Sequence, residues 1–228
     1  MKRNLDNIMF KKGITLFIIF IIVYIIIGYF FKSHFLIGTS INGIDLSCMN
    51  LNKATNHIKT TIGEYRLLIE GREKSSDIDL SGINFKYIDN DEIDTIVKKQ
   101  NSFLWIIDIF KRNNYIIKNI YSYDEELLKN KIDKLEFFNE DEIIYPENAS
   151  FIFIDTEFVI VDEVYGNYLN KEKVYSEIEK SIYTGQVLLN LDESNCYINP
   201  KYCSYSKKVK QGKNIIDKYM SSKVTYVF

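Results

Sequence analysis

The first long feature of the chain is an apolar run, residues 13–31, that contains no charged side chain. From Ile14 to Phe31 such a run would rise roughly 27 Å as a helix, which is enough to cross the hydrocarbon core of a bilayer. A run so long and so uniformly apolar is not typical of a buried helix in a soluble domain. The pattern therefore predicts a transmembrane helix over 13–31.

The charges before this run predict its orientation. Lys2, Arg3, Lys11 and Lys12 precede it, against Asp6 alone. By the positive-inside tendency the N-terminus stays in the cytoplasm and the rest of the chain lies outside. The following segment has no small-residue cleavage site, which favours an uncleaved anchor over a cleaved signal peptide. We expect a single-pass protein of the cell membrane with an extracellular C-terminal region.

Just beyond the anchor, the pattern predicts a strand–helix–strand unit. An Asn42-Gly43 turn joins two short apolar strands, and Asn50 is a plausible N-cap. Apolar residues at helical spacing follow it: Leu51, Ala54, Ile58 and Ile62. Residues 65–69 then read as a strand.

A similar unit recurs downstream. Asn170 opens a second amphipathic helix with Val174, Ile178 and Ile182 on one face, and Gly185 ends it before a strand over 187–191. LNKATNHIKTTI and LNKEKVYSEIEKSI share their opening and their isoleucine pair. One small α+β unit used twice explains this, and so does chance similarity between two amphipathic helices.

Helices and hairpins mix without a regular βαβ rhythm, which favours an α+β fold. A helix is predicted over 124–138, a hairpin around Asp155-Thr156, and a last helix that carries Val209, Ile216 and Tyr219. The expected organisation runs in this order: cytoplasmic stub 1–12, transmembrane helix 13–31, first α+β unit 36–99, apolar connector 100–122, second α+β unit 123–220, and the start of a strand at 221–228.

Composition excludes several classes of protein. Beyond residue 32 the chain carries 24 basic and 30 acidic residues, so nothing argues for nucleic acid as a partner. Three cysteines cannot form a fully paired disulfide framework, and none has the CxxC spacing of a zinc site. No P-loop, G-x-S-x-G, H-E-x-x-H or EF-hand motif is present. We expect no cofactor and no metal.

Candidates for catalysis are few. Cys48 and His57 are a conceivable nucleophile and base, but nothing nearby supplies a third orienting group or an oxyanion site. A solvated helix histidine is the better interpretation of His57. Acidic pairs such as Asp192-Glu193 are typical of solvated surface rather than of a glycosidase. The sequence therefore predicts no enzyme in this chain.

The only tryptophan, Trp105, lies in the apolar segment QNSFLWIIDIFKRNN. Its indole could offer a stacking face to a sugar. The density of apolar neighbours favours another interpretation, in which the cluster fills the gap between two small domains.

Several stretches, taken in order, resemble the exported non-catalytic region of Gram-positive L,D-transpeptidases. They are IGTSINGIDLS, KKQNSFLW, NASFIFIDTEFVIVDEVYGNYLNKEKVYSEIEKSI and LDESNCYINP, and together they cover most of residues 36–228. In that family the latter region is described as a peptidoglycan-binding domain. The family's catalytic cysteine lies in an S-x-G-C context, which none of the three cysteines here has. The resemblance implies that KVTYVF leads into a catalytic domain that this chain lacks.

The resemblance implies a membrane-anchored module that binds peptidoglycan, through its glycan strand or its stem peptide, without catalysis. Expected partners are peptidoglycan, the bilayer through 13–31, and a cell-wall enzyme. The alternatives are the N-terminal part of a cross-linking L,D-transpeptidase and an extracellular scaffold or sensor. Candidate ligand-binding residues are Tyr165, Asn167 and Tyr168, because residues beside Gly166 in a loop are accessible, together with Trp105.

Overall fold

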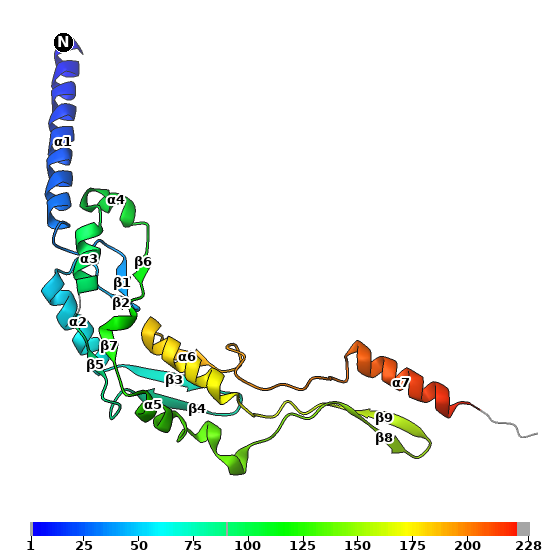
Figure 1. Ribbon diagram of the computed structural model, residues 1–228. Helices are drawn as coiled ribbons and strands as arrows, with labels where there is room; N and C mark the ends of the chain where they lie inside the picture. Colours follow the sequence, from blue (N-terminus) through cyan, green and yellow to red (C-terminus); the bar gives the residue numbers. More distant parts are fainter. Residues whose placement is uncertain (1, 90, 223–228) are drawn as a thin grey trace, which may run out of the picture. The chain divides into compact units, whose positions relative to one another are not determined.

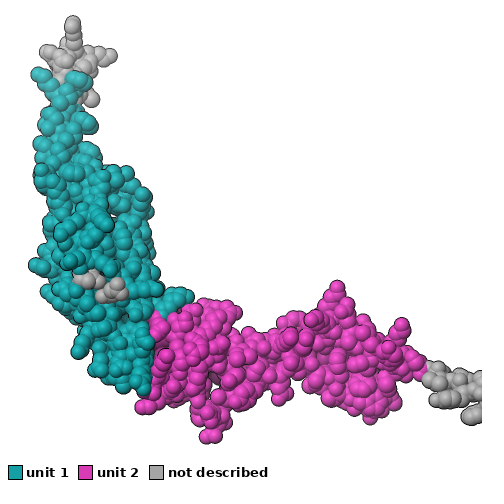
Figure 2. All heavy atoms as spheres, viewed as in Figure 1, with its two compact units in different colours: residues 1–67, 79–128, 180–187 teal, residues 68–78, 129–179, 188–228 magenta. Residues whose placement is uncertain are grey.

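The computed structural model of the chain describes residues 2–89 and 91–222. Within them the chain forms two compact units, coloured separately in Figure 2. Each unit is assembled from three segments: 1–67, 79–128 and 180–187 in unit 1, and 68–78, 129–179 and 188–228 in unit 2. Small sheets and amphipathic helices occur in both, which confirms the predicted α+β class.

The N-terminal helix α1 runs from Lys2 to Phe30. Its segment Phe10–Phe30 is long and apolar enough to cross a membrane, and it is the only such helix in the described part of the chain. Nearly all side chains of Phe10–Phe30 are exposed, as expected for a helix without a protein partner over most of its length.

Unit 1 contains short strands in two sheets: β1 (Thr39–Ile41), β2 (Ile44–Asp45), β5 (Lys86–Tyr87), β6 (Asn113–Tyr115) and β7 (Tyr121–Ser122). β1 pairs antiparallel with β2 and parallel with β6, and β5 pairs antiparallel with β7. Asn42 and Gly43 join β1 to β2 with φ values of 49° and 77°, so both adopt the left-handed backbone that the Asn-Gly pair predicts.

Unit 1 also contains helices and 3₁₀ turns (Figure 1): α2 (Leu51–Gly63), α3 (Asp91–Lys99), α4 (Trp105–Asp108), η1 (Ser102–Leu104) and η2 (Lys118–Ile120). The Asn50 Oδ1 accepts the Lys53 N–H at 2.9 Å, which confirms the predicted cap of α2. One apolar cluster forms the core of the unit: Phe35, Ile41, Leu46, Ala54, Ile58, Ile62, Ile93, Val97, Ile117, Ile120 and Tyr121.

Unit 2 contains a three-stranded sheet in the order β10–β3–β4 and a separate hairpin: β3 (Arg66–Glu70), β4 (Ser75–Asp79), β10 (Leu188–Asn190), β8 (Ser150–Ile154) and β9 (Glu157–Val161). β10 pairs parallel with β3, and β8 pairs antiparallel with β9. Asp155 turns the hairpin at a φ of 55°, where the sequence predicts a turn. Of the remaining helices, α5 (Glu125–Ile132) and α6 (Lys171–Thr184) have residues in both units, whereas α7 (Lys207–Met220) and the 3₁₀ turns η3 (Glu136–Phe138) and η4 (Glu140–Glu142) belong to unit 2.

Two helix predictions differ in their outcome. The Asn170 Oδ1 accepts the Lys173 N–H at 3.2 Å and caps α6 as predicted. The helix predicted over 124–138 is wrong in extent, because α5 ends at Ile132. There the Asp133 carboxylate accepts hydrogen bonds from Lys171 and Tyr175 of α6, and the chain leaves the helix axis. Residues 223–228, which hold most of the predicted terminal strand, lie outside the described residues.

Candidate functional site

Unit 1 holds a cavity of about 530 Å³, within the range of small-ligand sites. Segments far apart in the sequence form its walls: the β1–β2 turn, the side of α2, the start of β3, strand β7, and the end of α6 with the residues after it. Its lining comprises Asn42, Gly43, Ile44, Asp45, His57, Thr61, Ile62, Glu64, Tyr65, Arg66, Leu80, Phe85, Tyr121, Ile182, Gly185 and Val187.

The floor of the cavity depends on the buried side chain of Asn42. Its Oδ1 accepts the Ile117 N–H at 2.8 Å, and its Nδ2 donates to the Ile117 carbonyl at 2.9 Å. A buried amide that makes both bonds holds the turn and residue 117 in one register. The Asn42-Gly43 turn thus serves as a fixed wall rather than as a free loop.

Two tyrosines give the cavity polar groups within apolar walls. Tyr65 donates its hydroxyl hydrogen bond to the Gln186 carbonyl, and burial raises its pKa well above the usual value. Burial likewise raises the pKa of Tyr121 to about 12. Both phenols therefore stay protonated at neutral pH, and they offer ring faces and neutral hydroxyls rather than charge.

Charges of both signs lie among the exposed lining residues, in Asp45, Glu64 and Arg66, and His57 is exposed in the same lining. The Ser47 hydroxyl at 2.5 Å and the Ser47 N–H at 2.8 Å both donate to the Asp45 carboxylate and lower its pKa, so it is ionised at neutral pH. An apolar cavity with anionic and cationic groups at its edge can hold a zwitterionic ligand with small apolar side chains.

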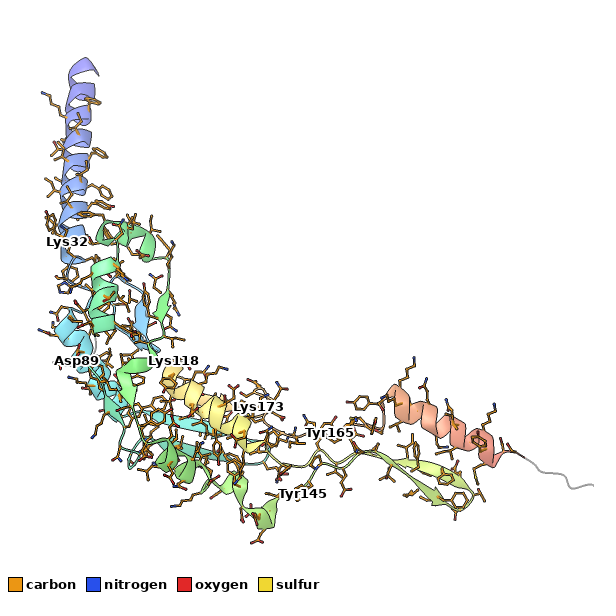
Figure 3. All side chains as sticks on the ribbon, in the orientation of Figure 1. Lys32, Asp89, Lys118, Tyr145, Tyr165 and Lys173 are labelled. Atoms are coloured by element: carbon orange, nitrogen blue, oxygen red, sulfur yellow. The ribbon has the colours of Figure 1, made fainter. Side chains whose placement is uncertain are left out.

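Unit 2 has a second hollow, of about 460 Å³, lined with aromatic rings. Tyr145 and Tyr168 lie against each other with ring centroids 4.7 Å apart, and Tyr145, labelled in Figure 3, is 60% exposed. Phe138 and Lys171 line the same hollow. Exposed aromatic faces beside a cation are suited to the apolar face of a sugar.

The structure gives the residues predicted from the 165–168 loop different surroundings. Tyr168 lines the aromatic hollow. The Asn167 side chain accepts the Ile144 N–H at 2.8 Å and donates to the Glu142 carbonyl at 3.0 Å, so its amide is occupied within the unit. The Tyr165 hydroxyl lies 3.3 Å from that of Tyr205. Of the three, Tyr168 is the residue that lines the hollow of about 460 Å³.

Trp105 lies in unit 1 and packs against the end of α1. Its ring is 5.7 Å from that of Tyr24 and 6.5 Å from that of Phe31, measured between centroids. Its Nε1 is buried and has no hydrogen-bond partner among the described residues. The indole is therefore an apolar contact for α1.

The cysteines do not have the surroundings of a nucleophile. All three are free thiols. Burial and the nearby Asp45 raise the pKa of Cys48, and burial raises the pKa of Cys196 to about 11. A reactive cysteine needs the opposite shift, toward the thiolate. Among the described residues no cluster of histidine, cysteine and carboxylate side chains could hold a metal.

The buried thiol of Cys196 makes the stability of the folded protein depend on pH in the alkaline range. The folded thiol keeps its proton up to about pH 11, whereas the thiol of the unfolded chain loses it near pH 8.5, so stability falls as the pH rises between these values. We expect urea titrations of the wild type to show this decline at about 1.4 kcal/mol per pH unit at most. A Cys196→Ala variant should start lower and decline less. Parallel curves for the two proteins would contradict the assignment.

The cavity has no local signal in the amino-acid sequence. Its turn was predicted at Asn42-Gly43, and Gly185 was predicted as a helix end, but nothing indicated that the two glycines meet. A Cβ on Gly185 would lie 2.2 Å from the Asn42 carbonyl oxygen, and one on Gly43 would lie 2.5 Å from the Thr184 carbonyl oxygen. The available hint was a glycine at each of these two turn positions, and both glycines have a positive φ in the structure.

Comparison with protein families gives one match. Residues 77–187, a little under half of the chain, match the family described as "Putative peptidoglycan binding domain". The matched region contributes Phe85, Tyr121 and Ile182 to the unit 1 cavity, and Tyr145 and Tyr168 to the aromatic hollow. No curated protein and no solved structure matches the chain. The match supports peptidoglycan as a partner and a non-catalytic role for this region.

Proposed function

We propose that this protein is a membrane-anchored module that binds peptidoglycan outside the cell and has no catalytic activity of its own. The match of residues 77–187 to a peptidoglycan-binding family carries the proposal. The apolar helix Phe10–Phe30, with lysines and an arginine before it, supports an anchor whose N-terminus is cytoplasmic. The raised pKa values of Cys48 and Cys196 fit a role in binding rather than acyl transfer.

The unit 1 cavity is the proposed binding site. Peptidoglycan stem peptides combine small apolar side chains with free carboxylates and amines. The cavity offers matching groups: apolar walls, neutral tyrosine hydroxyls, and Asp45, His57, Glu64 and Arg66 among its exposed residues. The aromatic hollow around Tyr145 and Tyr168 is a suitable place for the adjoining glycan.

The proposal is tested by sedimentation of the full-length chain, in mild detergent, with purified cell-wall sacculi. Saturable retention in the pellet is the expected result. A chain that stays in the supernatant at every concentration of sacculi would contradict the proposal. Sacculi stripped of stem peptides by an amidase separate the two ligand parts, and we expect them to retain much less protein.

A charged side chain in the cavity should weaken this binding. Val187 lines the cavity and is 66% exposed, so a Val187→Arg substitution places a long cation there with little cost to folding. We expect a loss of about tenfold in affinity for sacculi, corresponding to about 1.4 kcal/mol. Leu188→Arg is the matched control, because Leu188 is 48% exposed and is not among the cavity-lining residues. Equal loss in both variants would exclude the cavity as the site.

The resemblance to L,D-transpeptidases supports a more specific role, in which the module presents stem peptides to a cross-linking enzyme. The alternative is that this polypeptide belongs to such an enzyme and forms cross-links itself. An assay of the full-length chain with stem-peptide substrates distinguishes the two. We expect no cross-linked product from this chain alone, and product formation would favour the enzymatic alternative.

A further inference from the structure

Residues 102–110 pack against the last turns of α1, within unit 1. The Tyr24 hydroxyl donates a hydrogen bond to the Phe103 carbonyl. The Phe103 ring lies so close to Gly28 that a Cβ there would be 2.5 Å from a ring carbon. Trp105 covers the next stretch of α1 through Tyr24 and Phe31. Figure 1 shows α4 beside the end of α1.

These contacts place the segment at a definite level along the helix. Tyr24 precedes the end of the apolar span at Phe30 by six residues, which is about 9 Å along an α-helix. If α1 crosses the bilayer, the backbone at Phe103 therefore lies below the point where the span ends. It lies within the outer part of the membrane rather than above it.

The outer side of the segment is apolar, and no other described part of the chain covers it. Five large apolar side chains are 39% to 88% exposed: Leu104, Ile106, Ile107, Ile109 and Phe110. So dense an exposed cluster on a short segment marks an interaction surface rather than ordinary solvated surface. Asp108 is the only charged residue of the segment, and it is half-buried beside the Asn113 amide.

The backbone of the segment suits an apolar solvent. The N–H groups of Leu104, Ile109 and Phe110 donate to carbonyls within the segment or next to it, at 2.9 to 3.2 Å, and Tyr24 satisfies the Phe103 carbonyl. Backbone groups in lipid need such internal partners. Lys111 and Arg112 follow the segment directly, and Lys32, labelled in Figure 3, follows α1. Aromatic residues with cations beyond them are typical of the membrane–water boundary.

We infer that residues 102–110 form a second membrane contact, a short helical segment that inserts its apolar side chains into the outer leaflet beside α1. The ligand is the bilayer itself: acyl chains around Ile107 and Phe110, and anionic headgroups near Lys111 and Arg112. The inference rests on the proposed anchoring by α1. Two contacts in place of one hold unit 1 at a fixed height and tilt on the membrane surface, with its cavity outside the bilayer.

Trp105 is the only tryptophan, so it can be moved to report on single positions. The full-length chain carrying Trp105→Phe and Phe110→Trp is reconstituted in nanodiscs whose lipids bear a nitroxide near the headgroup or deep in the acyl chain. Phe110 is 88% exposed in the structure and is therefore a sensitive probe. We expect the emission of the tryptophan at position 110 to be blue-shifted. The nitroxide near the headgroup should quench most of this emission, and iodide in solution should quench little of it.

The matched control carries Trp105→Phe and Tyr219→Trp, since Tyr219 is 76% exposed on α7. Its emission should be quenched by iodide and not by either lipid nitroxide. If the Phe110→Trp probe behaves like this control, the inference is overturned. Anchoring by α1 is tested separately, by alkaline carbonate extraction of the protein from vesicles made of the same lipids. If the protein stays in the vesicles while the Phe110→Trp probe is exposed to water, only the second contact is overturned. If carbonate extracts the protein, the anchoring and the inference are overturned together.

Discussion

Replacing Arg72 with alanine is expected to lower the free energy of unfolding by about 3 kcal/mol, which corresponds to a fall in Tm of roughly 6–12 °C. Arg72 lies between β3 and β4 in unit 2, with a side chain that is 19% exposed. Its loss removes several bonds at once, so the effect should exceed that of an ordinary surface substitution.

The guanidinium of Arg72 joins three separate segments of unit 2. Its Nε and Nη2 both bond to the Asp192 carboxylate, at 2.9 to 3.2 Å. Its Nη1 donates to the Gly166 carbonyl and its Nη2 to the Asn199 side chain, each at 2.8 Å. The same group lies 4.1 Å from the centroid of the Tyr197 ring. Only a planar guanidinium, with its forked arrangement of N–H groups, can reach all of these partners.

An Arg72→Lys variant separates charge from geometry. It keeps the cation near Asp192 but cannot bond to both Gly166 and Asn199, so we expect it to recover only a minor part of the lost stability. Urea unfolding of the two variants measures this directly. Full recovery by lysine, or an alanine variant as stable as the wild type, would contradict the role assigned to the fork.

Replacing Gly185 with alanine is the second change expected to have a large effect, a destabilisation of about 3 kcal/mol. Gly185 has a φ of 68°, which strains any residue with a Cβ. The added atom would also lie 2.2 Å from the Asn42 carbonyl oxygen. That oxygen belongs to the backbone of the buried turn, which cannot move aside without losing the Asn42 bonds to Ile117.

Gly63→Ala is the control for this prediction. Gly63 is the last residue of α2, and nothing lies within 4 Å of the position of an added Cβ. Alanine there should be neutral or stabilise the protein by up to about 1 kcal/mol, because it restricts the unfolded chain. If Gly185→Ala proves as mild as Gly63→Ala in thermal unfolding, the close approach that shapes the cavity is not present in solution.

Local signals explain which elements could be predicted from the sequence. Helices α2 and α6 each begin with an asparagine cap and carry apolar residues at helical spacing, so their starts and buried faces were evident. Helix α3 has similar signals: acidic residues in its first turn, lysines in its last turn, and Ile93 and Val97 one turn apart. With only nine residues, this segment is short enough to be mistaken for a loop in the sequence.

Long-range pairing explains what could not be predicted. β1 pairs with β6 and β3 pairs with β10, in both cases parallel and between segments far apart in the sequence. Nothing within either strand specifies such a partner. The cavity depends on the same kind of contact, since Tyr121 and Val187 reach it from distant segments. The apolar cluster around Trp105 was recognised, but its contact with α1 depends on tertiary structure alone.

Equilibrium dialysis with a soluble muropeptide is the sharpest test of the proposed binding of peptidoglycan in the unit 1 cavity. The full-length chain in detergent is dialysed against a radiolabelled disaccharide that carries its stem peptide. We predict saturable binding of one muropeptide per chain, weakened about tenfold by Val187→Arg and unchanged by Leu188→Arg. The absence of saturable binding, or equal binding by the wild type and Val187→Arg, would contradict the account.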